Sequence, residues 1–131
     1  MSSGKGPSLK LLLWFLPVVD LFTLPRILGY YAARGIRVPR PHALLAMVER
    51  WAGYLPLGLL LGRWLGPLPS LLLFLAGMGL GGPLELLLMR RGRTPWGFLR
   101  GKEGTLLLRV FLLEGYNALG YFSLGLLLSL L

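Results

Sequence analysis

Polar side chains inside an apolar segment are the residues of this sequence whose types and spacing could do chemistry. Residues 106–122 read LLLRVFLLEGYNALGYF and include Arg109, Glu114 and Asn117. An ionisable group within hydrocarbon costs ~2.5–3.5 kcal/mol on insertion scales, so it usually faces other protein groups or a pathway. Glu114, Asn117 and Tyr121 are spaced by three and four residues, which places them on one face of a helix. We therefore expect a polar stripe that faces inward or toward a partner.

A second carboxylate, Asp20, is expected at a similar depth. Asp20 lies eleven residues into the first apolar stretch, and Glu114 lies nine residues after Thr105. At 1.5 Å per residue, Glu114 is then ~13 Å from the loop side and Asp20 is near the midplane. Three interpretations of these polar groups stay open: hydrogen bonds that hold helices together, a proton or cation role, and contact with a partner subunit.

Two acids and two arginines are expected closer to the basic loops. They are Glu49, Arg50, Glu85 and Arg109, all within about two helical turns of the loop side. We interpret them as a structural belt of ion pairs, in which the arginines can also extend to the headgroups. The alternative is a shallow site for an anion or a lipid phosphate.

Catalytic and metal-binding patterns are missing from the sequence. There is no cysteine, which excludes disulfides, thiol nucleophiles and thiolate metal sites. The single histidine, His42, stands between two loop-edge residues and is expected to be neutral or solvated. The sequence contains no G-x-S-x-G, H-E-x-x-H or phosphate-binding glycine loop. We therefore predict no catalytic set, no metal site and no cofactor.

The elements that must position these side chains are apolar helices. The chain has 131 residues, of which 55% are hydrophobic and 15% charged, and its mean hydropathy is +0.68. A soluble chain of this length could not cover so much apolar surface, so its solvent is lipid. Each apolar stretch is long enough to cross ~30 Å of hydrocarbon. The stretches are residues 9–31, 43–65, 68–89 and 105–131.

The predicted fold is an all-α integral membrane domain with about four transmembrane helices in two antiparallel hairpins. Pro17 and Pro25 are expected to kink or shorten the first helix. Residues 41–52 are amphipathic and could instead lie on the membrane surface, which would leave three spans.

The basic residues predict the orientation of the chain. The net charge is +9, and the basic residues concentrate in the loops 32–42 and 90–104. The positive-inside rule then places both loops in the cytoplasm and both termini outside, in the inner membrane of a prokaryote. Lys5 and Lys10 argue mildly for the opposite orientation. The expected electrostatic partners are anionic lipid headgroups, and no motif or compact basic face favours nucleic acid.

Small residues predict how the helices pack. In lipid, close approach at glycines replaces apolar burial as the cause of helix association. We expect two glycine ridges to bring the second and third spans together: Gly58, Gly62 and Gly66 on one, Gly77 and Gly81 on the other. The alternative is that a ridge faces another subunit.

A short segment resembles a known membrane family. Residues 92–97, GRTPWG, resemble the cytoplasmic loop of the RDD family, whose first span also contains an aspartate, as Asp20 does here. Phe98 stands where that family has a lysine, and the resemblance covers six residues. No function is carried over from it.

Three functions are consistent with these patterns. The first is a non-catalytic accessory subunit of a larger membrane complex, favoured by the short chain and the glycine surfaces. The second is a small homo-oligomeric transporter or channel that uses Asp20 and Glu114. The third is a lipid-modifying enzyme, which would need arginines to hold a phosphate and an acid to act as base.

Overall fold

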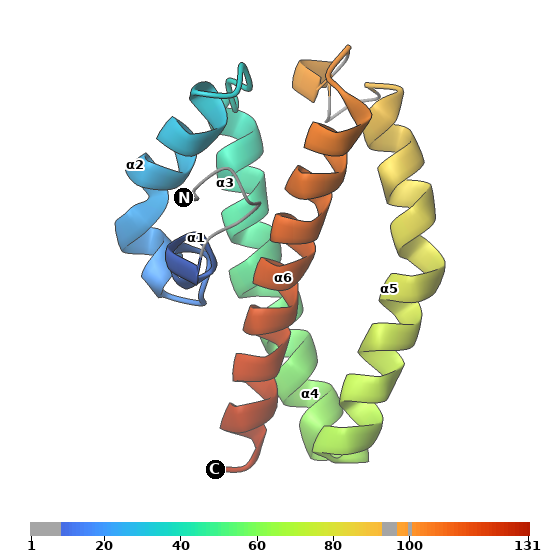
Figure 1. Cartoon of the computed structure of the whole chain (residues 1–131). Helices are drawn as coiled ribbons and strands as arrows, with labels where there is room; N and C mark the ends of the chain where they lie inside the picture. The colour runs from blue at the N-terminus through green and yellow to red at the C-terminus, as the bar shows by residue number, and fades with distance from the viewer. Residues whose placement is uncertain (1–8, 93–96, 100) are drawn as a thin grey trace.

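A computed structural model describes residues 9–92, 97–99 and 101–131, and this part of the chain is helical without strands (Figure 1). The helices in chain order are α1 (Leu9–Trp14), α2 (Val19–Ala32), α3 (Arg40–Glu49), the π-helical turn η1 (Arg50–Tyr54), α4 (Leu55–Leu65), α5 (Pro67–Arg90), the 3-10 turn η2 (Gly97–Leu99) and α6 (Gly104–Ser129).

Three helices in the described part are long and apolar enough to cross a membrane. They are Arg40–Leu65, which joins α3, η1 and α4, then α5 and α6. Three candidate spans indicate a membrane protein, as the composition predicts. The last three predicted apolar stretches correspond to these helices within a few residues.

The first apolar stretch differs from the prediction of one continuous helix over residues 9–31. It is divided into α1 and α2, which are separated by residues 15–18. Pro17 lies in this break, as expected, because proline lacks an N–H and its ring disrupts the preceding turn. Pro25 lies inside α2, which continues past it. With 14 residues, α2 alone is too short to cross the hydrocarbon core.

The second stretch forms one helical run that passes through a π turn. The run Arg40–Leu65 has 26 residues and continues through Gly53. A surface helix over 41–52 would need a break there, so the structure favours a span. The π turn η1 comes just before Pro56, where a regular helix cannot form its bond to the residue four positions earlier.

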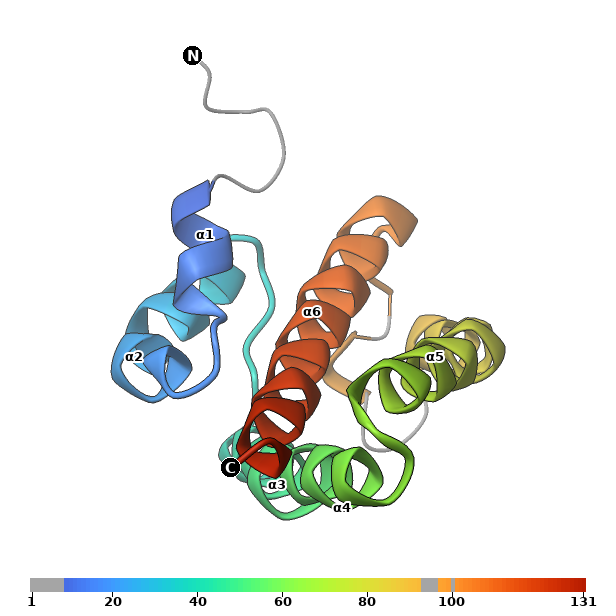
Figure 2. The same ribbon diagram turned by 90° about the horizontal axis from the view of Figure 1, so that it is seen from below.

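The arrangement of the helices is built around α6. Seen from below, α6 lies between the α1–α2 pair on one side and α5 on the other, with α3 and α4 along its third side (Figure 2). Nine residues of α6 are buried, more than in any other described helix. The buried apolar cluster includes Leu11, Ile27, Val110 and Leu113 from α1, α2 and α6.

The glycine ridge of α4 packs against α6 rather than α5, which corrects the predicted pairing of the second and third spans. A Cβ on Gly58 would overlap the carbonyl oxygen of Phe122, and one on Gly62 would overlap Ser129. Gly125 of α6 approaches the backbone of α4 equally closely. The partner of α4 is α6 because both helices have glycines at the contact, which allows their backbones to approach closely.

The other predicted ridge glycines do not take part in close packing. Gly66 has φ +90° and links α4 directly to α5. A Cβ on Gly77 or Gly81 would meet nothing within 4 Å. The helix α5 starts beside α4 and then stands away from it (Figure 1). It contacts α6 at a few places, including Gly82, where a Cβ would lie 3.0 Å from the Phe111 ring.

The two basic loops lie at the same end of the molecule, as the prediction requires. The loop after α2 and the described residues before α6 are both at the top in Figure 1. The Nζ of Lys102 donates a hydrogen bond to the Gly35 carbonyl at 2.6 Å, which joins the two segments. Lys5, Arg93 and Arg100, which also entered the charge argument, lie outside the described residues.

Candidate functional site

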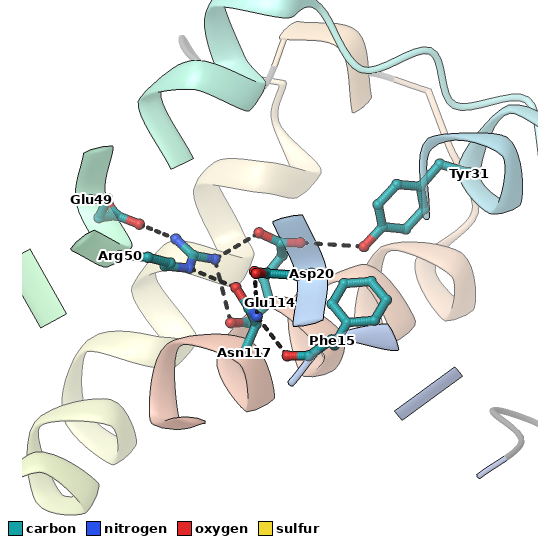
Figure 3. Close-up of polar contacts among 7 residues, drawn as sticks. All are labelled: Phe15, Asp20, Tyr31, Glu49, Arg50, Glu114 and Asn117. Atoms are coloured by element: carbon teal, nitrogen blue, oxygen red, sulfur yellow. Dashed lines mark hydrogen bonds and ion pairs between the residues drawn. The ribbon is translucent and has the colours of Figure 1, made fainter. Parts of the chain in front are cut away.

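The guanidinium of Arg50 is the centre of a buried polar network (Figure 3). Arg50 lies on the π turn η1 and is 5% exposed. Its Nη2 donates to Glu114 Oε1 at 2.8 Å, and its Nε donates to Asn117 Oδ1 at 3.0 Å. Its Nη1 pairs with Glu49, its neighbour in sequence. One arginine therefore connects the candidate span Arg40–Leu65 to the middle of α6.

Asn117 extends this network to the N-terminal helices. Its Nδ2 donates to Asp20 Oδ2 at 3.1 Å and to the carbonyl of Phe15 at 2.6 Å. The Tyr121 hydroxyl donates to Asp20 Oδ1 at 2.6 Å. Asp20 and Tyr121 are both buried, and Asp20 lies in the first turn of α2, where the helix dipole favours a negative charge. The carboxylate of Asp20 therefore has two side-chain donors from α6.

Side chains satisfy the backbone groups that the break between α1 and α2 leaves free. The Val18 N–H donates to the Tyr121 hydroxyl at 3.2 Å, and Thr23 Oγ1 donates to the Trp14 carbonyl at 2.8 Å. Val18 has φ +70°, which is strained for a β-branched residue. Non-helical backbone is tolerated at membrane depth only where protein groups or water satisfy it. The network on α6 therefore also holds the break.

The three residues of the predicted polar stripe on α6 each make polar contacts in the structure. Glu114, Asn117 and Tyr121 all face the interior and bind groups on other elements. Asp20 and Glu114, which are expected at a similar depth, make no direct contact. Asn117 binds Asp20, and Arg50 binds both Asn117 and Glu114. Glu114 also accepts a hydrogen bond from the Tyr31 hydroxyl at 3.3 Å.

The predicted ion-pair belt is wrong in its grouping. Arg50 pairs with Glu49, as the belt requires, but also with Glu114 from the deeper stripe. Arg109 contacts the Tyr30 hydroxyl at 3.3 Å and forms no ion pair within the described residues. Glu85 has no ion pair there either. Residues at one depth can lie on different sides of a bundle, and depth alone does not reveal which ones meet.

His42, which is expected at a loop edge as a neutral or solvated residue, lies on a helix instead. It lies in the first turns of α3, and its ring packs edge-on against Phe98 with centroids 4.7 Å apart. Its Nδ1 is buried and has no hydrogen-bond partner among the described residues. The loop prediction fails because α3 begins at Arg40, two residues before the histidine.

Sequence reasoning missed three members of the network. They are the Tyr31 hydroxyl, the Phe15 carbonyl and Thr23. The proline at 17 was a usable signal for the last two, because a broken helix leaves backbone groups that need partners. Tyr31 carried no such signal.

The chemistry available at this network is hydrogen bonding and charge pairing. Within the described residues, no group of three or more metal-binding side chains comes together. A cavity of about 720 Å³ adjoins the network and is lined by residues of α2, Arg40–Leu65, α5 and α6.

The fold and the network define a helical membrane protein with three candidate spans and a buried arginine-centred polar cluster. No family model, curated protein or solved structure matches the chain. The short likeness to the RDD family therefore gains no support, and residues 93–96 of that segment lie outside the described part.

Proposed function

We propose that this chain is a small, non-catalytic integral subunit of a larger membrane complex. The observation that carries the proposal is that the ionisable groups of the polar network already have partners within the chain. Arg50 binds Glu114, and Asp20 accepts hydrogen bonds from Asn117 and Tyr121. These contacts hold α2, Arg40–Leu65 and α6 together. This arrangement suits a scaffold whose helices must keep fixed positions for a neighbour.

The uneven burial of the long helices supports an interaction role. In the most apolar 18-residue segment of each candidate span, the share of buried residues is 6% for α5 and 11% for Arg40–Leu65, compared with 44% for α6. Gly79 on α5 is exposed and leaves open space around it. Small residues allow a second helix to approach closely in a bilayer, so α5 offers a surface to another subunit.

The proposed setting is the inner membrane of a prokaryote. The loops 32–42 and 90–104 lie in the cytoplasm beside anionic headgroups, which basic residues attract. In this proposal the divided segment α1–α2 completes a fourth crossing, and both termini are outside. Within the set of helices, α1–α2 and α5 then lie on opposite sides of α6.

A homo-oligomeric transporter is the second candidate, and the break between α1 and α2 favours it. Broken helices at membrane depth form the ion and substrate sites of many transporters. Here the break adjoins Asp20 and lies against Asn117, at the middle of α6.

Flux through reconstituted protein separates the two candidates. Purified chain in proteoliposomes is expected to move no protons or cations above the level of empty liposomes. A flux that disappears in Glu114→Gln, and persists in Glu103→Gln at the exposed start of α6, would overturn the subunit proposal in favour of the transporter.

A further inference from the structure

The cavity beside the network has the size and walls of a site for an organic molecule. Its volume is about 720 Å³, and ligand sites typically measure roughly 300–1,000 Å³. Most of its wall is apolar and comes from four parts of the chain. Examples are Ile27 of α2, Leu61 of α4, Phe74 of α5 and Val110 of α6.

The charges around the cavity are opposite to those of the whole chain. Four of the chain's five acidic residues line it, but among the described lysines and arginines only Arg50 does. The acids are Asp20, Glu49, Glu85 and Glu114. The chain as a whole carries a net charge of +9. The cavity is therefore an acidic region in a basic protein, and it favours a cationic occupant.

The one arginine at the cavity is already engaged. Its Nε, Nη1 and Nη2 donate to Asn117, Glu49 and Glu114. It therefore offers little to an anionic group. Glu85 differs, because it lines the cavity and makes no hydrogen bond or ion pair within the described residues. A cation in the cavity would give the Glu85 carboxylate an opposite charge to pair with.

The α5 wall leaves room for an apolar body. Gly77 and Gly81 line the cavity, and a Cβ on either would meet nothing within 4 Å. Tyr54 and Phe74, with ring centroids 5.7 Å apart, also line the cavity and add aromatic surface to its apolar lining.

We propose that this cavity binds an amphipathic organic cation. Its apolar body lies along Gly77 and Gly81 of α5, and its positively charged head lies beside Glu49 and Glu85. The proposal does not depend on whether the chain works in a complex or alone. A neutral lipid chain and an anionic amphiphile are the other occupants that the test distinguishes.

Equilibrium dialysis with a matched pair of ions tests the charge preference. The probes are tetraphenylphosphonium and tetraphenylborate, which have similar shapes and opposite charges. The intact protein is held in uncharged dodecyl maltoside micelles, and protein-free micelles give the background. We expect saturable binding of one tetraphenylphosphonium per chain, and at least about tenfold weaker binding of tetraphenylborate over background.

Two variants with matched controls test the place of binding. Glu85→Gln removes a charge at the cavity, and Glu103→Gln removes the one acid outside it. Gly81→Leu fills the cavity, and Gly79→Leu adds the same side chain at an open position outside its lining. Glu85→Gln and Gly81→Leu should each weaken tetraphenylphosphonium binding about tenfold. The controls Glu103→Gln and Gly79→Leu should change it by less than about twofold. Gly77→Leu replaces Gly81→Leu if circular dichroism shows that the latter loses helix.

Each other outcome overturns the proposal. Absence of saturable binding, or equal binding of tetraphenylborate, excludes a cation site. Loss of binding in the leucine variant alone shows an apolar site without charge preference. Loss in Glu85→Gln alone places the cation outside the cavity.

Discussion

Arg50 joins the candidate span Arg40–Leu65 to α6, and Asn117 extends the polar network to Asp20 of α2. The partners of Arg50 on α6, Glu114 and Asn117, belong to the stripe that the sequence spacing predicts together with Tyr121. The arginine itself was assigned to the wrong group, because depth along a helix is visible in the sequence but its direction around the helix axis depends on the neighbours. The π turn η1 adds to this, since it rotates the residues around it away from regular α-helical positions.

Removing the central arginine should destabilise the fold. Arg50→Met leaves Glu114 and Asn117 without their donor, and we expect a loss of about 2 kcal/mol in the free energy of unfolding. Glu114 is partly exposed, so the loss stays below that for a fully buried pair. Reversible unfolding in sodium dodecyl sulfate, followed by circular dichroism, measures it.

The matched control for this change is Arg63→Met. Arg63 is exposed on α4, and its replacement should alter the free energy of unfolding by less than about 0.5 kcal/mol. Adding Glu114→Gln to Arg50→Met should recover part of the stability, because no unpaired charge remains. Equal losses in Arg50→Met and Arg63→Met would show that the network does not stabilise the protein.

The hydroxyl of Tyr121 should hold the break between α1 and α2. Tyr121→Phe removes the acceptor of the Val18 N–H and a donor to Asp20. We expect a loss of about 1 kcal/mol and faster hydrogen exchange at the Val18 amide. Tyr116→Phe on the same helix is the control, because that hydroxyl makes no hydrogen bond within the described residues. Unchanged exchange at Val18 in Tyr121→Phe would contradict this role.

At the scale of elements, the sequence predicts where helices lie better than which ones touch. Length and hydropathy located the spans near 43–65, 68–89 and 105–131, and Pro17 located the break in the first stretch. The partner of the α4 glycines could not be predicted, because spacing shows that a ridge exists but not which helix lies against it. The short link at Gly66 suggested α5, whereas the packed partner is α6.

The contact between α4 and α6 should depend on its glycines. Gly58→Ala places a methyl group against the Phe122 carbonyl, so the helices must separate. We expect a loss of at least about 2 kcal/mol in the free energy of unfolding, as for overpacked cores. Gly79→Ala, in open space on α5, should be neutral or slightly stabilising. Similar stabilities for both variants would show that α4 and α6 do not pack closely.

At the scale of the whole molecule, the absence of cysteine makes the topology directly measurable. Arg37→Cys, Lys10→Cys and Leu131→Cys each introduce a single thiol at an exposed position. In spheroplasts, an impermeant maleimide should label Lys10→Cys and Leu131→Cys before permeabilisation and Arg37→Cys only after it. Labelling of Lys10→Cys only after permeabilisation would show that α1–α2 returns to the cytoplasmic side without crossing.

The proposed role as a subunit concerns the molecule and its neighbours together. The composition predicted a membrane protein, and the three candidate spans agree with it. Neither the helices nor the network names a partner, because the α5 surface is defined by small and apolar residues that many helices would fit.

Native mass spectrometry of the tagged chain, extracted gently from its host membrane, tests the central proposal most directly. The proposal predicts particles that contain this chain and different proteins at fixed stoichiometry. Particles made only of multiples of the 14.5 kDa chain would contradict it and favour a homo-oligomeric transporter.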